Sequence, residues 1–216
     1  MMKVIILDFD GVVVESVDIK TEAFRELFKK YENVDDIIQY HLQNNAISRF
    51  IKLRYIYEHF LGKEYNEEIE KEAGERFSEI VFRKVVECPF VAGAEKFLKT
   101  FSETHPIYLI SATPQEELER IVTKRNIQDY FKKVWGRPPG NKVDFIKRAL
   151  ENENANPGEA IYIGDMREDY RIAKKVGIRF VGRKNVESFD GFNIPVFPDM
   201  VRIKEWVQDK IKEETI

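Results

Sequence analysis

Short, uninterrupted apolar runs recur along this chain, and they limit the folds that it can adopt. A parallel strand covered on both faces is apolar at every position, whereas a strand with one solvated face alternates. The runs occupy residues 4–7, 107–110, 160–163 and 178–181, the last with Arg179 as its one charged residue, and segments 194–197 and 133–135 are candidates for two more strands. Helical patterns around Leu118, Phe145 and Ile172 separate the later runs, and Gly177 is placed to end the last of these helices. We therefore predict an α/β fold with a doubly wound, Rossmann-like parallel sheet.

The segment 16–87 departs from this alternation, because it contains helical patterns and no convincing strand. Apolar residues at helical spacing occur at positions 23–28, 47–55 and 69–81; in the second pattern they are Ile47, Phe50, Ile51 and Tyr55. The segment 88–93 then leads back to the next strand. We predict a core formed by 1–15 and 88–216, with an α-helical cap inserted at 16–87.

Charge and composition exclude several classes of protein. Thirty-five basic and 38 acidic side chains give a net charge of −3, which argues against a dedicated nucleic-acid binder. A single cysteine, Cys88, excludes an internal disulfide and a multi-cysteine metal site. No apolar run approaches the length of about 20 residues that a membrane span needs. We expect a cytoplasmic protein without membrane or nucleic-acid partners, either a monomer or a homodimer.

Carboxylates and a hydroxyl follow three of the predicted strands. Asp8 and Asp10 end the first strand, Ser111 ends the second, and Asp165 and Asp169 follow a later one. Ligands of open parallel sheets bind outside the carboxyl ends of the strands, so these groups are expected to converge. Carboxylates brought together repel one another unless a cation lies between them, and all-oxygen ligands suit Mg²⁺. The sequence therefore predicts a Mg²⁺ site.

Two predicted helix starts add affinity for an anion. Thr113 precedes Pro114 and Glu116 in a capping-box pattern, so Thr113 is predicted as an N-cap. Asn141 is predicted to cap the next helix, with Lys142 in its first turn. A lysine there opposes the helix macrodipole, and such a departure at a predicted ligand crevice indicates function. Lys142 and the helix dipole together would attract a phosphate group.

These segments, in this order, resemble the haloacid dehalogenase superfamily in its Mg²⁺-dependent phosphohydrolase branch. The motif Asp-x-Asp-Gly-(Thr/Val) matches residues 8–12, the lone Ser or Thr matches Ser111, the lone Lys matches Lys142, and Gly-Asp-x-x-x-Asp matches 164–169. A helical insertion between the first two motifs is similar to the subfamily of phosphoglycolate phosphatases and β-phosphoglucomutases. The resemblance covers about two-thirds of the chain and does not extend to the details of the cap.

The resemblance implies that Asp8 attacks phosphorus and becomes an aspartyl phosphate. Asp10 would protonate the leaving alkoxide and then deprotonate the attacking water. Mg²⁺ would be held by Asp8, Asp165 and the backbone carbonyl of Asp10.

Phosphate binding is implied for Ser111, the neighbouring Ala112 and Lys142. Asp169 is expected to hold Lys142 or a metal-bound water. The substrate would be a small phosphorylated metabolite, resembling phosphoglycolate or a sugar phosphate.

The cap offers weaker candidates. Arg49 and Lys52 fall on one helical face and are candidates for binding a distal anionic group of the substrate, although a solvated basic face explains the same pattern. The three histidines, among them His41, lack the spacing of metal ligands. Arg183 and Lys184 follow a strand end, where they would border the site or, as we favour, lie in a solvent-facing loop.

Two other functions stay open. A phosphomutase of the β-phosphoglucomutase type uses the same chemistry but returns the phosphate to the substrate. A non-catalytic sensor of phosphorylated ligands, or an assembly partner, would bind without turnover. Formation of an isomerised sugar phosphate would identify the first, and absence of turnover on every phosphoester would favour the second.

Overall fold

The structure is a computed structural model that describes residues 1–44, 47–137 and 140–214. The chain divides into two compact units. Met1–Glu15 and Cys88–Ile216 form the first, which we call the sheet unit, and Ser16–Glu87 form the second, the helical unit.

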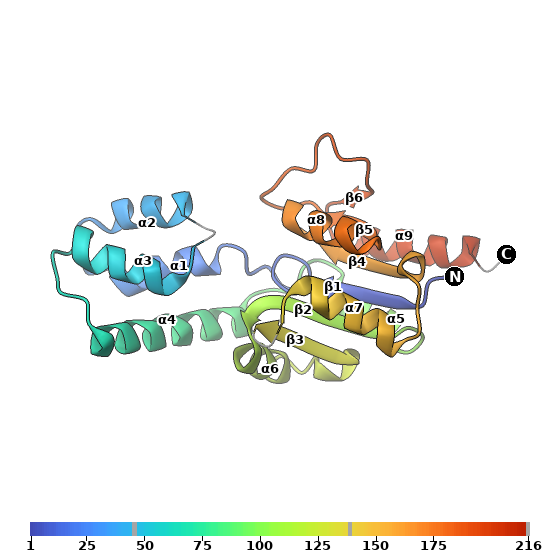
Figure 1. The fold of residues 1–216 in the computed structure, drawn as a ribbon, viewed down its shortest axis with the longest axis horizontal. Coiled ribbons are helices and arrows are strands. Elements are labelled where there is room, and N and C mark those ends of the chain that lie inside the picture. The colour runs from blue at the N-terminus through green and yellow to red at the C-terminus, as the bar shows by residue number, and fades with distance from the viewer. Residues whose placement is uncertain (45–46, 138–139, 215–216) are drawn as a thin grey trace. The chain divides into compact units, whose positions relative to one another are not determined.

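The sheet unit is built on a six-stranded sheet in the order β3-β2-β1-β4-β5-β6, with every neighbouring pair parallel (Figure 1). Its strands are β1 (Val4–Asp8), β2 (Ile107–Pro114), β3 (Lys133–Arg137), β4 (Ala160–Gly164), β5 (Arg179–Arg183) and β6 (Val196–Phe197). The chain starts in the middle of the sheet, builds one side through β3 and then returns to build the other from β4. The predicted α/β class and parallel sheet are confirmed, and each predicted apolar run lies in or overlaps a strand.

Helices cover both faces of this sheet, as a doubly wound fold requires. On one face, α7 (Lys142–Asn152) packs against α8 (Arg167–Val176); α5 (Ala94–Ser102) packs against α9 (Met200–Glu213) on the other (Figure 1). The remaining α-helix, α6 (Gln115–Lys124), packs on β2 and β3, and single 3₁₀ turns lie at Gln128–Tyr130 and Pro157–Glu159. No helix within the described ranges has the length and apolarity to cross a bilayer.

The pleat of β1 decides where its final carboxylate points. Val4 and Ile6 belong to the core cluster under α7 and α8, together with Ala160 and Tyr162 of β4. Because side chains alternate along a strand, Asp8 projects to that same face. It stands at the carboxyl end of β1, where the connections of the sheet reverse direction and ligands bind in folds of this type.

The helical unit contains α1 (Ile19–Phe28), α2 (Val34–Gln43), α3 (Arg49–Tyr55), a π-helical turn (Ile56–Phe60) and α4 (Glu67–Glu87). Its core includes Phe24 and Phe77, whose ring centroids are 4.7 Å apart. The pattern predicted for α1 and that for α4 correspond to their buried faces.

The prediction for α3 was wrong about its face. Ile47, Phe50, Ile51 and Tyr55 are exposed, whereas the buried residues of this segment are Lys52, Leu53 and Ile56. Leu53 and Ile56 are also spaced as one helical face, so apolar residues occur on two faces of a short helix. Periodicity cannot choose between them, and the packing of neighbouring helices does.

The predicted cap of α6 was also wrong. β2 continues through Thr113 to Pro114, which pairs with Arg137 of β3 beyond a bulge. The helix begins at Gln115 with Pro114 as its N-cap and no side-chain cap hydrogen bond. Thr113 therefore ends a strand, and its backbone N–H donates to Ser111 Oγ at 3.0 Å.

Candidate active site

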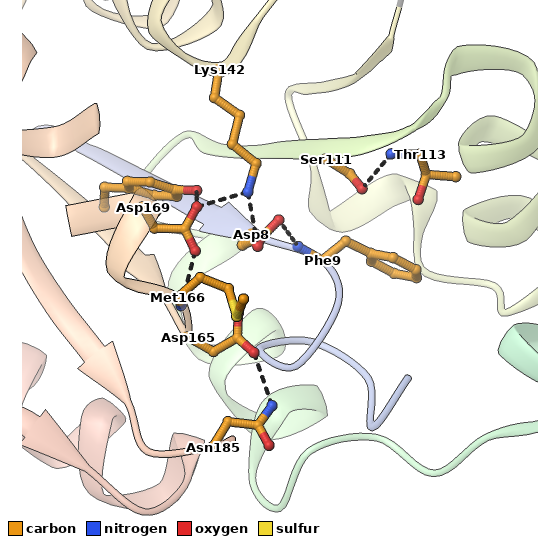
Figure 2. Close-up of polar contacts among 10 residues, drawn as sticks. Asp8, Phe9, Ser111, Thr113, Lys142, Asp165, Met166, Asp169 and Asn185 are labelled. Atoms are coloured by element: carbon orange, nitrogen blue, oxygen red, sulfur yellow. Dashed lines mark hydrogen bonds and ion pairs between the residues drawn. The ribbon is translucent and has the colours of Figure 1, made fainter. Parts of the chain in front are cut away.

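Lys142 joins two carboxylates at the carboxyl edge of the sheet. Its Nζ lies 2.9 Å from Asp8 Oδ2 and 2.8 Å from Asp169 Oδ1 (Figure 2). The other oxygen of Asp8, Oδ1, accepts the backbone N–H of Phe9 at 2.8 Å. All three charged side chains are buried. Residues more than 130 positions apart in the sequence thus form one ion-paired cluster.

Lys142 is placed by the start of α7. Asn141 caps that helix, its side chain accepting the backbone N–H of Asp144 at 3.2 Å, as predicted. Burial lowers the pKa of the Lys142 ammonium, but the charges of Asp8 and Asp169 outweigh this effect and raise the pKa overall. Lys142 therefore remains a cation in a buried position.

Asp169 is held by three donors. Its Oδ1 accepts Lys142 and also the hydroxyl of Tyr162 at 2.6 Å, and its Oδ2 accepts the backbone N–H of Met166 at 3.2 Å. The expected contact between Asp169 and Lys142 is thus present. Tyr162 was not identified from the sequence, where it appeared as one more member of an apolar strand. Its hydroxyl within an otherwise aliphatic run was the available signal.

Asp165 completes an acidic group with Asp8 and Asp169. Each offers an oxygen within 4.8 Å of the others. Burial raises the pKa of Asp8 well above its ordinary value, and the charge of Lys142 opposes this rise only in part. Burial also raises the pKa of Asp165 to about 7. Three buried carboxylates share one ammonium, so the cluster has an excess of negative charge that a divalent cation would neutralise.

Asp10 and Ser111 flank this cluster. The charge of Asp10 contributes to the raised pKa of both Asp8 and Asp165, so it acts on both of them. Ser111 is fully buried and lies one residue beyond Ile110, the register partner of Asp8. Ala112, next in β2, is exposed at the same edge. The sequence-predicted residues of the sheet unit therefore lie together.

The last residue of β5, Arg183, and the segment after it also reach this edge. Arg183 is buried rather than solvent-facing, which corrects the prediction, while Lys184 is exposed. Arg183 Nη2 lies 2.6 Å from Glu15 Oε1, and Nη1 donates to the carbonyl of Gly11 at 3.4 Å. Asn185 Nδ2 donates to Asp165 Oδ2 at 2.8 Å (Figure 2). The sequence placed Arg183 at a strand end but did not indicate its contacts, and nothing in it distinguished Asn185, because the partners of both residues lie far away along the chain.

Arg49 and Lys52 belong to the helical unit. Lys52 is only 3% exposed, so a solvated basic face is excluded for it. Its Nζ lies 3.1 Å from His41 Nδ1, and His41 Nε2 lies 3.1 Å from Thr21 Oγ1. Burial lowers the pKa of His41 to about 4 and that of Lys52 to about 8. The neutral imidazole thus accepts from Lys52 through Nδ1 and donates to Thr21 through Nε2.

Residues 5–183 match the family model of the haloacid dehalogenase-like hydrolases. The chain belongs to this hydrolase family. The match spans β1 to the end of β5 and so includes all of the motif residues and the helical insertion. No curated protein matches the chain at a significant level.

Solved structures share this hydrolase fold over nearly the whole chain. One is a β-phosphoglucomutase from Clostridium difficile, with 23% identity and a TM-score of 0.70 over 100% of this chain and 99% of that one. Another is described as a predicted phosphoglycolate phosphatase from Haemophilus somnus, with 16% identity and a TM-score of 0.74 over 95% and 98%. A third is a haloacid dehalogenase-superfamily hydrolase from Geobacter sulfurreducens, with 16% identity and a TM-score of 0.71 over 95% and 96%. At these identities the likeness concerns the fold.

Proposed function

We propose that this protein is a Mg²⁺-dependent phosphatase that hydrolyses a small phosphorylated metabolite through an aspartyl phosphate on Asp8. The observation that carries the proposal is the cluster of Asp8, Lys142, Asp165 and Asp169. Three separate segments of the chain deliver these four groups to one edge of the sheet, and Lys142 Nζ lies 2.9 Å from the Asp8 carboxylate.

The cluster suits Mg²⁺ by its chemistry. Its ligand atoms are carboxylate oxygens, which hard divalent cations prefer, and histidine or thiolate ligands are absent from the group that the described residues form. Asp169 already accepts Lys142, Tyr162 and a backbone N–H. Asp8 and Asp165, with the backbone carbonyl of Asp10, would therefore hold the ion. When bound, Mg²⁺ supplies positive charge that neutralises the phosphate and polarises its oxygens.

Asp8 would act as the nucleophile. Its carboxylate is oriented by the N–H of Phe9 and by Lys142, and Lys142 also provides positive charge for the equatorial oxygens of the transferring phosphoryl group. Ser111 and the backbone at Ala112 would bind the same oxygens. Asp10 would protonate the leaving alkoxide and afterwards take a proton from the water that hydrolyses the aspartyl phosphate.

The helical unit would act as the cap that selects the substrate. Lys52 is a buried amine whose hydrogen-bond partner is a neutral histidine, and the neighbouring charge of Lys20 lowers its pKa further. An anionic group would stabilise its charged form. We place the distal anionic group of the substrate against Lys52 and Arg49. This assignment favours a metabolite with a second acidic group.

The test is phosphate release from para-nitrophenyl phosphate and from a panel of phosphorylated metabolites, with and without Mg²⁺. Asp8→Asn should lower kcat by at least about a thousandfold, because it removes the nucleophile. Asp209→Asn, an exposed aspartate on α9, is the matched control and should keep full activity. Full activity of Asp8→Asn, or no turnover of any phosphoester by the wild type, would refute the proposal.

A phosphomutase is the second candidate, since the fold is similar to that of a β-phosphoglucomutase and the same residues can return the phosphate. Nuclear magnetic resonance of phosphorus separates the two reactions when a sugar phosphate is the substrate. A phosphatase yields inorganic phosphate, whereas a mutase yields an isomeric sugar phosphate.

The role of Lys52 has its own test. Lys52→Met should raise the KM of the preferred metabolite at least about tenfold and leave kcat on para-nitrophenyl phosphate unchanged, because that ester lacks a distal anion. Since a methionine needs no counterion when buried, the variant should be at least as stable as the wild type. Lys63, an exposed lysine whose Nζ donates to the Tyr31 hydroxyl, provides the control variant Lys63→Met. An unchanged KM would remove Lys52 from the substrate site.

A further inference from the structure

The three buried carboxylates of the cluster are supported to different degrees. Asp169 accepts three donors, and Asp8 accepts Lys142 and the N–H of Phe9. The Asp165 carboxylate, only 1% exposed, accepts one hydrogen bond from the described part of the chain, and the donor is the side-chain amide of Asn185 at 2.8 Å. A buried carboxylate with one neutral donor depends on that donor for its orientation.

Asn185 reaches Asp165 because of the register between β4 and β5. Gly164, the last residue of β4, pairs with Gly182, so Asp165 and Arg183 are the next residues on the two neighbouring chains. Arg183, the last residue of β5, holds the start of the segment after that strand through its contacts with Glu15 and the carbonyl of Gly11. The side-chain amide of Asn185, two residues after Arg183, is thereby held over Asp165.

The loop after Asp10 lies close to both Asp165 and Asn185. Gly11 lies so near that a Cβ there would be 2.1 Å from Asp165 Oδ2 and 2.6 Å from Asn185 Nδ2. Asp165, Asn185 and the Gly11 backbone therefore meet without space for another side chain.

We infer that Asn185 is a positioning residue for the metal, a role that rests on the proposed function. Its N–H occupies one acceptor position of Asp165 Oδ2 and fixes the plane of the carboxylate, whose remaining lone pairs are then presented to the cation. Partners of this kind behind a metal ligand typically change metal affinity by about 10–100-fold when they are removed. Asn185 acts through Asp165 and does not touch the substrate.

The experiment measures Mg²⁺ affinity directly, by calorimetric titration of the substrate-free protein, and phosphatase activity as a function of Mg²⁺ concentration. Asn185→Ala should weaken Mg²⁺ binding about 10–100-fold. Saturating Mg²⁺ should restore kcat and leave the KM for para-nitrophenyl phosphate unchanged, because the chemical groups stay in place. A purely structural role would instead lower kcat at every Mg²⁺ concentration.

Two further variants keep the test decisive. Asn185→Leu keeps the side-chain volume but removes the hydrogen-bond donor, so it should weaken Mg²⁺ binding as Asn185→Ala does. If the alanine variant folds poorly, the leucine variant provides the test. Asn193→Ala, an exposed asparagine of the same unit, should bind Mg²⁺ like the wild type. Wild-type affinity in both Asn185 variants, with a wild type that binds Mg²⁺, would overturn this inference alone. A wild type that neither binds Mg²⁺ nor releases phosphate would overturn the proposed function and this inference with it.

Discussion

Gly11 has a backbone conformation and surroundings that exclude a side chain. Its φ of +72° is in the left-handed region, and the Asp165 carboxylate occupies the volume in which a Cβ would lie. A glycine, here the last residue of Asp-x-Asp-Gly, is the residue that adopts this conformation without strain. The second requirement, close approach to Asp165, depends on a residue more than 150 positions away and was invisible before the fold was known.

We predict that Gly11→Ala lowers both stability and Mg²⁺-dependent activity. The left-handed conformation costs about 1–2 kcal/mol in a residue with a Cβ, and the clash with Asp165 adds to this cost. Urea unfolding and phosphate release measure the two effects. Gly191→Ala is the matched control, because Gly191 has a φ of +83° with open space around it. Gly191→Ala should lose only the conformational part of the unfolding free energy and none of the activity. Equal losses of stability and activity in the two variants would show that the clash with Asp165 has no effect of its own.

At the scale of whole elements, the starts of two helices show what capping patterns predict and where they fail. Asn141 caps α7 as expected, with an extended backbone and a side chain that accepts the N–H of Asp144. Thr113 carries an equally good pattern but remains in β2, since pairing with β3 extends the strand to Pro114. A pairing partner elsewhere in the chain outweighed the local preference for a cap.

We predict that Asn141→Ala lowers the free energy of unfolding by about 0.5–2 kcal/mol through loss of the cap. It should also lower kcat, because Lys142 occupies the first turn of that helix. Asn141→Asp should restore both, since aspartate caps equally well. Asp199→Ala removes the cap of α9, whose side chain accepts the N–H of Arg202 at 2.9 Å. This control should lose similar stability with unchanged kcat; an equal loss of kcat in both alanine variants would show that capping acts only through global stability.

At the scale of the whole molecule, the charge cluster couples folding to pH and to the metal. Burial raises the pKa of Asp165 to about 7, whereas an unfolded aspartate titrates near about 3.9. Between these values the folded, metal-free protein holds a proton that the unfolded chain releases. Its unfolding free energy therefore receives a contribution that falls as pH rises from about 4 to about 7.

Mg²⁺ should raise the melting temperature more at about pH 8 than at about pH 5, because at the lower pH Asp165 must first lose its proton. The lowered pKa of His41 makes a contribution of opposite sign to the unfolding free energy. That contribution is the same with and without Mg²⁺, so it cancels when the two melting temperatures are subtracted. Thermal melts at the two pH values, in wild type and in Asp165→Asn, provide the measurement. The variant should lose the Mg²⁺-dependent shift at both. An equal shift in the wild type at both pH values would contradict the linkage.

The connections to the helical unit lie side by side within the sheet unit. The N–H of Glu15 donates to the carbonyl of Pro89 at 3.0 Å, and that of Val91 donates to Val13 at 3.1 Å. A short glycine–serine linker in place of residues 16–87 should therefore leave the sheet unit folded. We predict that this variant unfolds cooperatively, binds Mg²⁺ and hydrolyses para-nitrophenyl phosphate, but no longer discriminates among metabolites. Retained discrimination would show that residues outside the helical unit select the substrate.

The sequence by itself determined the class of fold and the hydrolase family, and it supplied the motif residues that we propose for the site; the predicted insertion at 16–87 coincides with the helical unit. Buried parallel strands are recognisable one at a time, because each must be apolar throughout, and the carboxylates that follow them stand out against such runs. The family match confirms the motif-based resemblance, and the fold places Asp8, Lys142, Asp165 and Asp169 together.

Only the tertiary structure decided which neutral side chains support those charges and which face of α3 is buried. The contacts of Tyr162, Asn185 and Arg183 could not be predicted locally, since each is made with a partner on another segment. The burial of Lys52 instead of Phe50 likewise depends on how α3 packs against other helices. Hydrogen bonds and packing act over a few ångströms in space, whereas patterns along a chain report only on neighbours in sequence.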